Sequence, residues 1–460
     1  MLERSDATTR CAASFSQQSL WLLRQFDPLS SAYNLQIGLR LKGPLHYDAL
    51  KSSLQEIVNR HDVLRTKFAL EEDQLLQIVV PHYTVSLPVV DLSSLEESAR
   101  QVAAYQSAWE ETQQRFDLSQ EPLFRFKLVR LASNDHVLNC VMDHIVSDGW
   151  SLGIWVRELT SLYTACSNGQ GSPLAPLPIQ YRDYAQWQRE SIAGELFETQ
   201  VGYWKRKLDG APALLELRTG RVRPQQQTFA GSSQWLPISA DVIRGLKSLS
   251  AKHDATLFMV AFAAFQWLLS RYSGREDILV GVPVAGRNRW ETEELIGMFV
   301  NTVVIRTDLA GNPRFRDLVK RVRAVAIEGF CNSDLPFATL VEELHPVRNA
   351  SYNPIFQVMF AVIKSAVQSN VFGALHVTPY VVASGTSNLD LTVNLIECAN
   401  EQWLVQIDYN SSLFDNGMMT GLLEDYVSSL QVVLSQPDTR LSDLERYFDK
   451  NTTHIRSIGR

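Results

Sequence analysis

The sequence VMDHIVSDGWS, at residues 141–151, follows an apolar run that predicts a buried strand and precedes a stretch with helical periodicity. His144 is therefore expected at a strand end, on a tight turn that Asp148 and Gly149 complete. This H-x-x-x-D-G spacing suits acyl transfer. A neutral imidazole can accept a proton from an amine or alcohol near pH 7. A glycine lets a substrate approach the backbone closely, and its N–H group can stabilise a developing oxyanion.

The same residues also have a purely structural interpretation. A packed histidine, with Asp148 capping the following helix, would give the same pattern. From average residue usage, H-x-x-x-D-G arises by chance in roughly 3% of chains of this length, so the motif needs support from the rest of the sequence.

The residues before and around the motif alternate between two kinds of pattern. Polar and apolar residues alternate in some segments, which predicts half-buried strands, and apolar residues recur with helical spacing in others. The predicted strands are 34–41, 123–131 and 137–142, and the predicted helices are 16–26, 47–59 and 152–163.

The second half of the chain repeats this alternation. A helix at 255–272 is apolar nearly all round and is therefore expected to be buried. The other predicted elements are strands at 277–284, 302–307, 356–362, 391–396 and 403–409, and amphipathic helices at 315–327 and 417–434. Strands that alternate with helices in both halves indicate an α/β fold with two lobes.

The composition places the boundary between these lobes. A chain of 460 residues exceeds what one hydrophobic core usually covers. Residues 167–178 (SNGQGSPLAPLP) are rich in Gly, Ser and Pro, which is typical of an exposed linker. We therefore predict an N-terminal lobe at 1–170, a linker at 171–180 and a C-terminal lobe at 181–460.

Charge and cysteine content exclude several classes of function. The net charge of −7 does not suggest a nucleic-acid partner. The five cysteines are far apart and odd in number, which argues for a reducing compartment, and no His/Cys spacing suggests a metal. The first ten residues contain no secretory signal, and the most apolar stretch, 256–269, is too short to span a membrane. A cytoplasmic protein without a membrane partner is expected.

The wider sequence resembles the condensation domains of non-ribosomal peptide synthetases. Seven stretches, spread from residue 14 to residue 356, are similar to the signatures of that family and follow the same order. They are SFSQQSLWLL (14–23), RHDVLRTKF (60–68), MDHIVSDGWS (142–151), YRDYAQWQR (181–189), IGMFVNTVVIR (296–306), NSDLPFA (332–338) and RNASYNPIF (348–356).

The resemblance implies a fold and an activity. The fold would be a chloramphenicol-acetyltransferase-like pair of lobes that form a V-shaped pseudo-dimer around a central tunnel, with a floor loop and a latch in the C-terminal lobe. Upstream and downstream carrier proteins, and an adjacent adenylation domain, would be the partners. Substrates would be tethered to the phosphopantetheine of the carriers, and the chain itself would bind no cofactor. As an acyltransferase it would join a donor thioester to an acceptor amine as an amide.

The resemblance also implies roles for individual residues. His144 matches the second histidine of the family motif, as a general base or as a positioning group, and Gly149 matches the backbone position near the thioester. Asp148 would point away from the substrate and pair with Arg60 or Arg65, because a buried carboxylate needs a partner. Residues that would line the tunnel are Trp150, Ser151, Asn301, Ser384 and Ser387.

Asp143 departs from the family, because the usual first histidine of the motif is absent. Asp143 can be a supporting residue, held by backbone N–H groups or a nearby arginine, in which case Asp143→His would keep amide formation within about tenfold. Alternatively, Asp143, Asp148 and Ser151 spell the D-x-x-x-x-D-x-x-S signature of heterocyclization domains. We favour amide formation, because His144 and Gly149 are present.

Two further alternatives follow from the shared H-x-x-x-D-G motif. A free-standing acyltransferase of similar sequence would use coenzyme A esters, although no D-F-G-W-G stretch of the plant enzymes occurs here. A non-catalytic recruitment platform of the same fold would typically have lost the histidine and glycine of the motif.

Overall fold

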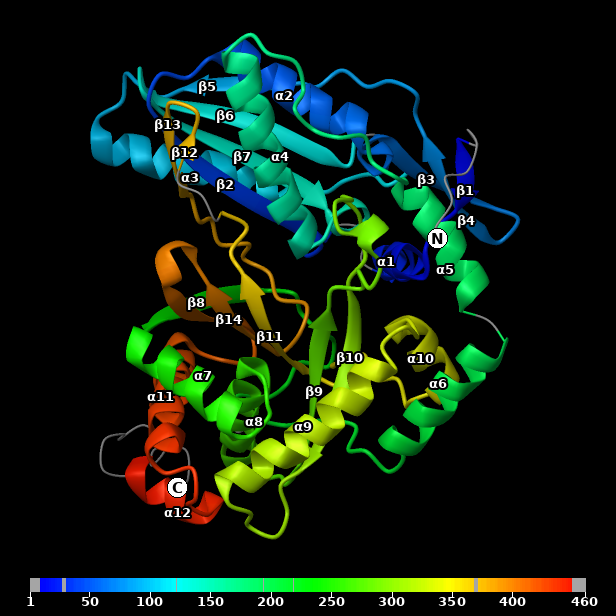
Figure 1. The fold of residues 1–460 in the computed structure, drawn as a ribbon, viewed down its shortest axis with the longest axis vertical. Coiled ribbons are helices and arrows are strands. Elements are labelled where there is room, and N and C mark those ends of the chain that lie inside the picture. Colours follow the sequence, from blue (N-terminus) through cyan, green and yellow to red (C-terminus); the bar gives the residue numbers. More distant parts are fainter. Residues whose placement is uncertain are drawn as a thin grey trace. The chain divides into compact units, whose positions relative to one another are not determined.

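The structure is a computed structural model that describes residues 9–26, 30–120, 122–192, 194–217, 219–367 and 371–448. The prediction that the first ten residues contain no secretory signal rests mostly on residues 1–8, which lie outside this range. The chain forms two compact units (Figure 1). Unit 1 comprises Met1–Ala193, Ala285–Val300 and Ala366–Ser384, and unit 2 comprises Gly194–Val284, Asn301–Ser365 and Gly385–Arg460.

Unit 1 is built on a mixed six-stranded sheet. Its central strands, β2 (Asn34–Lys42), β7 (Asp135–Asp143) and β6 (Phe124–Ala132), pair antiparallel. The outer strands are β5 (Val89–Asp91), β12 (Val371–Phe372) and β13 (Leu375–Pro379), the last of which pairs with β2. A smaller sheet contains β1 (Arg10–Ala12), β3 (Thr66–Glu71) and β4 (Gln74–Val79).

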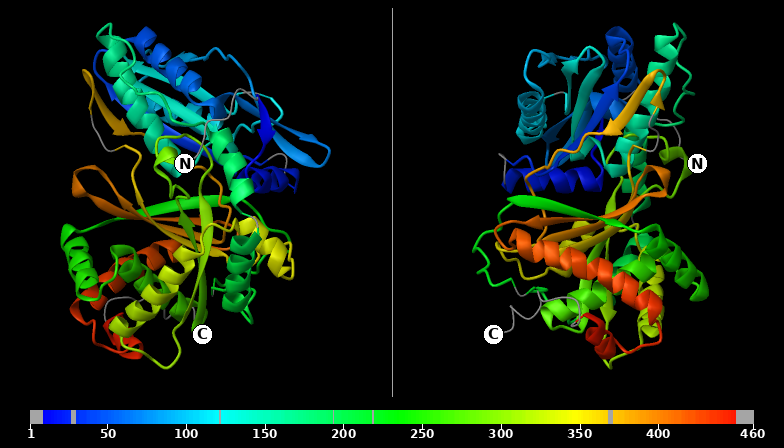
Figure 2. Two further views of the ribbon diagram at one scale, coloured as in Figure 1. Left: turned by 45° about the vertical axis from the view of Figure 1, so that its right-hand side comes forward. Right: turned by 90° about the vertical axis from the view of Figure 1, so that its left-hand side faces the viewer.

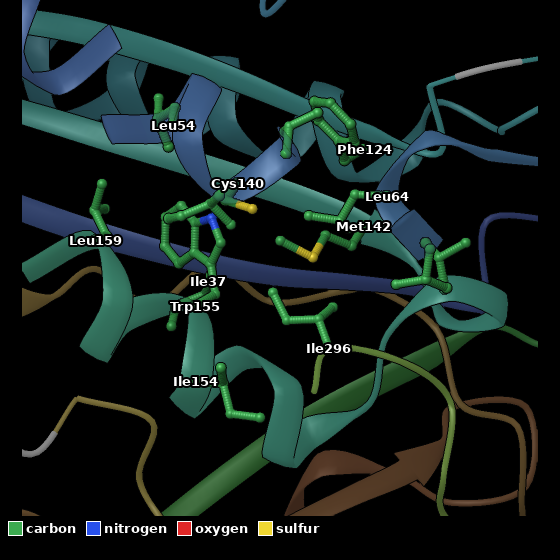
Figure 3. Close-up of a cluster of buried hydrophobic side chains, with 14 of the residues drawn as sticks. Ile37, Leu54, Leu64, Phe124, Cys140, Met142, Ile154, Trp155, Leu159 and Ile296 are labelled. Carbon is green, nitrogen blue, oxygen red and sulfur yellow. The ribbon is translucent and has the colours of Figure 1, made fainter. Parts of the chain in front are cut away.

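Helices cover both faces of the large sheet in unit 1. Side chains of α2 (Tyr47–Arg60) and α4 (Gly149–Ser167), among them Leu54 and Trp155, pack on one face (Figure 3). The ring of Trp155 stacks on Phe126 of β6. The small residue Ala104 of α3 (Glu97–Gln113) packs on the other face. The remaining helices of unit 1 are α1 (Phe15–Phe26), η1 (Asp62–Arg65), η2 (His144–Val146), α5 (Tyr181–Ser191) and η3 (Trp290–Thr292).

Unit 2 is a second α/β unit (Figure 2). Its six-stranded sheet has the order β10 (Asn301–Asp308), β9 (Asp277–Val284), β11 (Val358–Lys364), β14 (Leu391–Glu397), β15 (Trp403–Asn410) and β8 (Gly231–Ile238). The strand β11 runs parallel to both of its neighbours, and the other pairs are antiparallel. The helices are α6 (Gly194–Leu208), α7 (Ala240–Lys252), α8 (Leu257–Ser273), α9 (Phe315–Cys331), α10 (Phe337–Leu344), η4 (Ala399–Glu401), α11 (Asn416–Ser435) and α12 (Leu441–Phe448).

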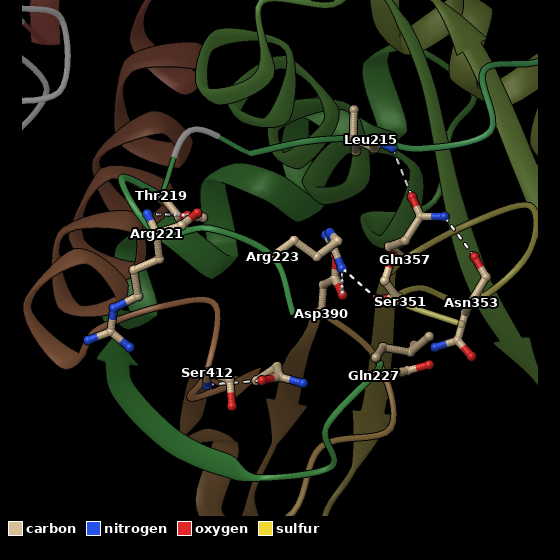
Figure 4. A network of polar contacts seen from close by, with 12 residues as sticks. Leu215, Thr219, Arg221, Arg223, Gln227, Ser351, Asn353, Gln357, Asp390 and Ser412 are labelled. Atoms are coloured by element: carbon tan, nitrogen blue, oxygen red, sulfur yellow. Dashed lines mark hydrogen bonds and ion pairs between the residues drawn. The ribbon is translucent and has the colours of Figure 1, made fainter. Parts of the chain in front are cut away.

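A polar network fastens an irregular segment of unit 2 to its sheet (Figure 4). Arg223 donates to Asp390 at 3.0 Å, next to the start of β14. Gln357, next to β11, accepts the N–H of Leu215 at 2.8 Å and donates to the carbonyl of Asn353 at 2.8 Å. The two bonds of Gln357 satisfy backbone groups that belong to no helix or strand, as buried polar groups require.

The predicted boundary between the lobes was wrong. Residues 171–180 do not link the two units, because they lie wholly within unit 1, and although six of the ten are exposed, Leu177 and Ile179 add their side chains to its core. The units divide instead after Ala193, so α5 also belongs to unit 1. Two later segments return to unit 1, which means that neither unit is one continuous piece of chain. Composition correctly marked the segment as a loop, but it did not reveal that two apolar side chains attach the end of this loop to unit 1.

Within the described part of the chain, no helix combines the length and the apolar character that crossing a membrane requires.

Candidate functional site

The predicted turn lies between β7 and α4 in unit 1. The strand ends at Asp143, the short helix η2 begins at His144, and Asp148 caps α4. Two carboxylates hold the turn. Asp143 Oδ1 accepts the N–H of Ile145 at 2.9 Å, and Asp148 Oδ1 accepts the N–H of Ser151 at 2.7 Å. His144 therefore stands at a strand end, as the sequence predicts.

The hydrogen bonds of His144 determine which ring nitrogen carries the proton. Nδ1 lies 2.8 Å from the carbonyl oxygen of Ser147, and a carbonyl can only accept. In the neutral ring Nδ1 is therefore the donor, and Nε2 carries the lone pair. The backbone N–H of His144 donates to the carbonyl of Tyr33 at 2.9 Å, which fixes the residue from the other side. The side chain is half-buried. A neutral His144 can thus accept a proton at Nε2.

Asp148 forms a buried ion pair with Arg287, at 3.2 Å, and each side chain is 2% exposed. Asp148 Oδ2 also accepts the N–H of Phe299 at 3.0 Å. The guanidinium of Arg287 donates to the carbonyls of Thr292 and Leu295 at 2.5 and 2.7 Å. Asp148 therefore has a buried arginine partner, as predicted, but that partner is Arg287 and not Arg60 or Arg65.

Arg60 and Arg65 have other partners in unit 1. Arg60 Nε donates to Glu158 at 2.8 Å. Arg65 donates to Asp62 at 2.6 Å and to backbone carbonyls, including that of Val58 at 3.0 Å. Both arginines therefore support the second signature stretch, and neither contacts Asp148. Arg287 was missed because it lies 139 residues from Asp148 in the chain, and no local pattern selects it.

Ser151 is fully buried between Asp148 and the segment 285–300 of unit 1. Its Oγ lies 2.7 Å from Asp148 Oδ1 and 2.9 Å from the carbonyl of Gly297, and it accepts the N–H of Gly297 at 3.0 Å. The hydroxyl is engaged inside the protein.

Asp143 is 1% exposed and forms an ion pair with Arg24 of α1. Burial raises the pKa of Asp143, although the guanidinium of Arg24 and the N–H of Ile145 oppose that rise. Both kinds of partner expected for this carboxylate, a backbone N–H group and an arginine, are therefore present. The sequence alone did not identify Arg24.

Gly149 is exposed and begins α4. A Cβ atom added there would meet no heavy atom within 4 Å, and its φ is not in the left-handed region. Nothing in the described chain therefore requires glycine at this position. Trp150 is 52% exposed and donates from its indole N–H to the carbonyl of Glu293 at 3.1 Å.

The later polar candidates have structural partners of their own. Asn301 lies in unit 2, where its Nδ2 donates to the carbonyls of Ser333 and Leu335, both at 2.8 Å. Ser387 of unit 2 is buried and donates to the carbonyl of Leu389 at 2.7 Å. The carbonyl of Ser384, in unit 1, accepts from Gln113 at 2.7 Å.

The described residues include no group of three or more His, Cys, Asp or Glu side chains that could hold a metal ion.

Sequence relatives cover nearly the whole chain. A family model described as "Condensation domain" matches residues 8–455. One of the linear gramicidin synthase proteins of Brevibacillus parabrevis is 42% identical over 431 residues, which are 93% of this chain and 8% of that protein. The chain thus corresponds to a small part of that relative.

Solved structures share the fold. The X-domain from teicoplanin biosynthesis has a TM-score of 0.85 and 26% identity, over 96% of this chain and 99% of that chain. Holo-AB3403, a four-domain nonribosomal peptide synthetase bound to AMP and glycine, has a TM-score of 0.85 and 23% identity, over 96% and 34% of the two chains. The predicted α/β fold with two lobes is confirmed.

Proposed function

The chain belongs to the condensation-domain family, and from this premise we propose that it forms an amide between a donor acyl or peptidyl thioester and an acceptor aminoacyl thioester. The observation that carries the proposal is the hydrogen bond between His144 Nδ1 and the carbonyl of Ser147, which leaves Nε2 as the proton acceptor of the neutral ring. Five residues on, Gly149 is exposed, and a Cβ atom added there would have open space around it.

The proposed reaction is an acyl transfer between two tethered substrates. The acceptor amine attacks the thioester carbonyl carbon, a C–N bond forms and the C–S bond breaks. The donor thiol leaves on its own carrier, so the lengthened chain remains on the acceptor carrier. The amine loses one proton, which His144 Nε2 accepts before it passes to the departing thiolate.

Gly149 is proposed to stabilise the oxyanion of the tetrahedral intermediate. It is the first residue of α4, where backbone N–H groups lack acceptors inside the helix. Such groups favour negative charge, and the absence of a side chain lets the thioester approach them. Orienting the two substrates can supply a further large part of the acceleration.

The proposed partners are an upstream and a downstream carrier protein with phosphopantetheine arms, and an adjacent adenylation domain. The similarity to the linear gramicidin synthase protein supports this, because the chain spans only 8% of that relative. We also propose a cytoplasmic location.

The contacts of the D-x-x-x-x-D-x-x-S residues support amide formation over heterocyclization. Asp143, Asp148 and Ser151 are all buried, and each has a partner inside unit 1. On this proposal they hold the turn and do not contact the substrate. Asp143 then replaces the first histidine of the family motif in a supporting role.

The proposed function is tested by mixing the protein with donor and acceptor carriers loaded with thioesters. We expect mass spectrometry to find an amide on the acceptor carrier, with no loss of a further water from Cys-, Ser- or Thr-loaded acceptors. Loss of that water would establish heterocyclization instead. Faster turnover with a coenzyme A ester as donor would favour the free-standing acyltransferase, and no turnover with either donor would favour a recruitment platform.

Gly149→Ala is expected to lower the rate of amide formation by about tenfold or more, because its methyl group would stand where the thioester approaches. Stability should not fall, since alanine is the better helix former. Gly202→Ala in α6 is the matched control, because its Cβ would meet only one atom of Arg206, at 3.4 Å. Carrier assays and thermal melts of both variants would check this, and a Gly149→Ala protein with the parent's rate would contradict the role of this backbone.

A further inference from the structure

A buried ion pair lies directly beside the turn that holds His144 and supplies no reacting atom to the reaction proposed above. Arg24, in the last turn of α1, pairs with Asp143 at the end of β7. The two side chains are 6% and 1% exposed. Buried charges of this kind are costly unless each is compensated, so neither residue can lose its partner without consequence.

Arg24 is held by more than its carboxylate. Nη1 donates to the carbonyl of Ser30 at 2.6 Å, and Nη2 lies 3.5 Å from Asn34 Oδ1. Asn34 is fixed in turn, because its Nδ2 donates to the carbonyls of Thr112 and Gln114, both at 2.8 Å. The guanidinium is therefore a fixed point between α1 and the start of β2.

The carboxylate of Asp143 connects the guanidinium of Arg24 to the turn that holds His144. It pairs with Arg24, and its Oδ1 accepts the N–H of Ile145, on the far side of His144. The turn that it caps is the one in which His144 Nδ1 bonds to the carbonyl of Ser147. One side chain thus connects α1 to the backbone on either side of His144.

We propose that Arg24 is a positioning residue for His144, acting through Asp143, and that the two charged side chains form a unit whose members cannot be replaced one at a time. This inference rests on the proposed function, because its effect is read in amide formation. Arg24 contacts no reacting atom in this scheme. It orients the turn and balances the charge of Asp143.

The ion pair between Arg24 and Asp143 should affect how the rate of amide formation depends on pH. The groups that face the Asp143 carboxylate are Arg24 from α1, Arg125 from β6 and His144 itself. Arg125 is also paired with Glu111 of α3, at 3.4 Å. Burial already raises the pKa of Asp143, and loss of the Arg24 charge would raise it further, so the carboxyl group would take up a proton at a higher pH than in the parent. Protonation of Asp143 would weaken its bond to the N–H of Ile145 and loosen the turn that holds His144, so the acidic limb of the pH–rate profile should move to higher pH.

The Arg24–Asp143 pair also changes the expected effect of Asp143→His, which restores the histidine that is usual in the family. Asp143→His would place an imidazole against the buried guanidinium of Arg24, which would lose its counter-charge. We therefore expect this single change to lower amide formation by more than about tenfold, in contrast to the smaller effect predicted from sequence. Arg24→Met should restore activity in the Asp143→His background.

The test compares Arg24→Met, Asp143→Asn and the double variant in the carrier assay, over a range of pH. We expect Arg24→Met to lower kcat by about tenfold with little change in KM for either carrier, and to move the acidic limb to higher pH. The neutral double variant should be more active than Arg24→Met, with its acidic limb at the parent's position. Arg24→Lys, which keeps the charge, should recover most of kcat.

Arg40→Met provides the control at the opposite end of the same two strands. Arg40 of β2 pairs with Asp135 of β7 at 2.6 Å, and the side chains are 26% and 20% exposed. This variant should keep the parent's kcat and pH profile. The inference is overturned if the Arg24→Met and Asp143→Asn losses multiply in the double variant, or if Arg24→Met leaves the pH profile unmoved. Failure of the parent protein to form amides would instead refute the proposed function.

Discussion

Asp148→Ala is expected to lower the free energy of unfolding by about 3–5 kcal/mol, which is the usual cost of breaking a buried ion pair from one side. The change would leave Arg287 charged and 2% exposed, with its counter-charge removed. It would also remove the acceptor for the N–H groups of Ser151 and Phe299. Urea unfolding, followed by circular dichroism, would measure the loss, and amide formation should fall as the turn loosens.

An exposed ion pair between the same two segments provides the matched control. Arg157 of α4 pairs with Glu294 in the segment 285–300, as Asp148 pairs with Arg287, but both of its side chains are 54% exposed. Solvent screens such a pair, so Glu294→Ala should change stability by less than about 1 kcal/mol. If Asp148→Ala were as stable as Glu294→Ala, the buried pair would contribute nothing to stability.

Elements with a clear periodic pattern of apolar residues were predictable from the sequence. Two elements that were not predicted lack such a pattern, and each has a physical reason for it. The strand β2 alternates polar and apolar residues because one of its faces packs on the core, and its predicted start is correct. The strand β8 was not predicted, because it is an edge strand whose residues are mostly half-buried or exposed. The helix α3 was not predicted either. It buries alanines such as Ala104 and Ala108, which give a weak periodic signal.

Only the part of the candidate site that lies within one short stretch of sequence was predictable. His144, Asp148 and Gly149 follow one another in a single turn, so their spacing places them together. Their partners come from distant segments: Arg24 lies 119 residues from Asp143, and Arg287 lies 139 residues from Asp148. The need for a partner follows from the cost of burying a carboxylate, but the choice among the chain's arginines depends on how the sheet and the returning segment pack.

His144→Ala is expected to lower the rate of amide formation by about 10²-fold or more, the usual effect of removing a positioned proton acceptor. The fold should survive, because the imidazole is half-buried and its one described side-chain bond is to the carbonyl of Ser147 within the same turn. The rate would be measured with loaded donor and acceptor carriers, as the amount of amide on the acceptor. The control is His376→Ala, in the exposed part of β13, which should keep the parent's rate.

The pH profile of His144→Ala separates the two roles that the histidine can have. If Nε2 accepts a proton in the reaction, the parent's rate falls at low pH as the imidazole is protonated, and the alanine variant lacks that acidic limb. If the imidazole only orients the acceptor amine, the variant is slower but keeps the same acidic limb, because the amine itself still titrates. The bond from Nδ1 to Ser147 leaves Nε2 as the acceptor, so we expect the first result. Turnover by His144→Ala at the parent's rate would remove both roles.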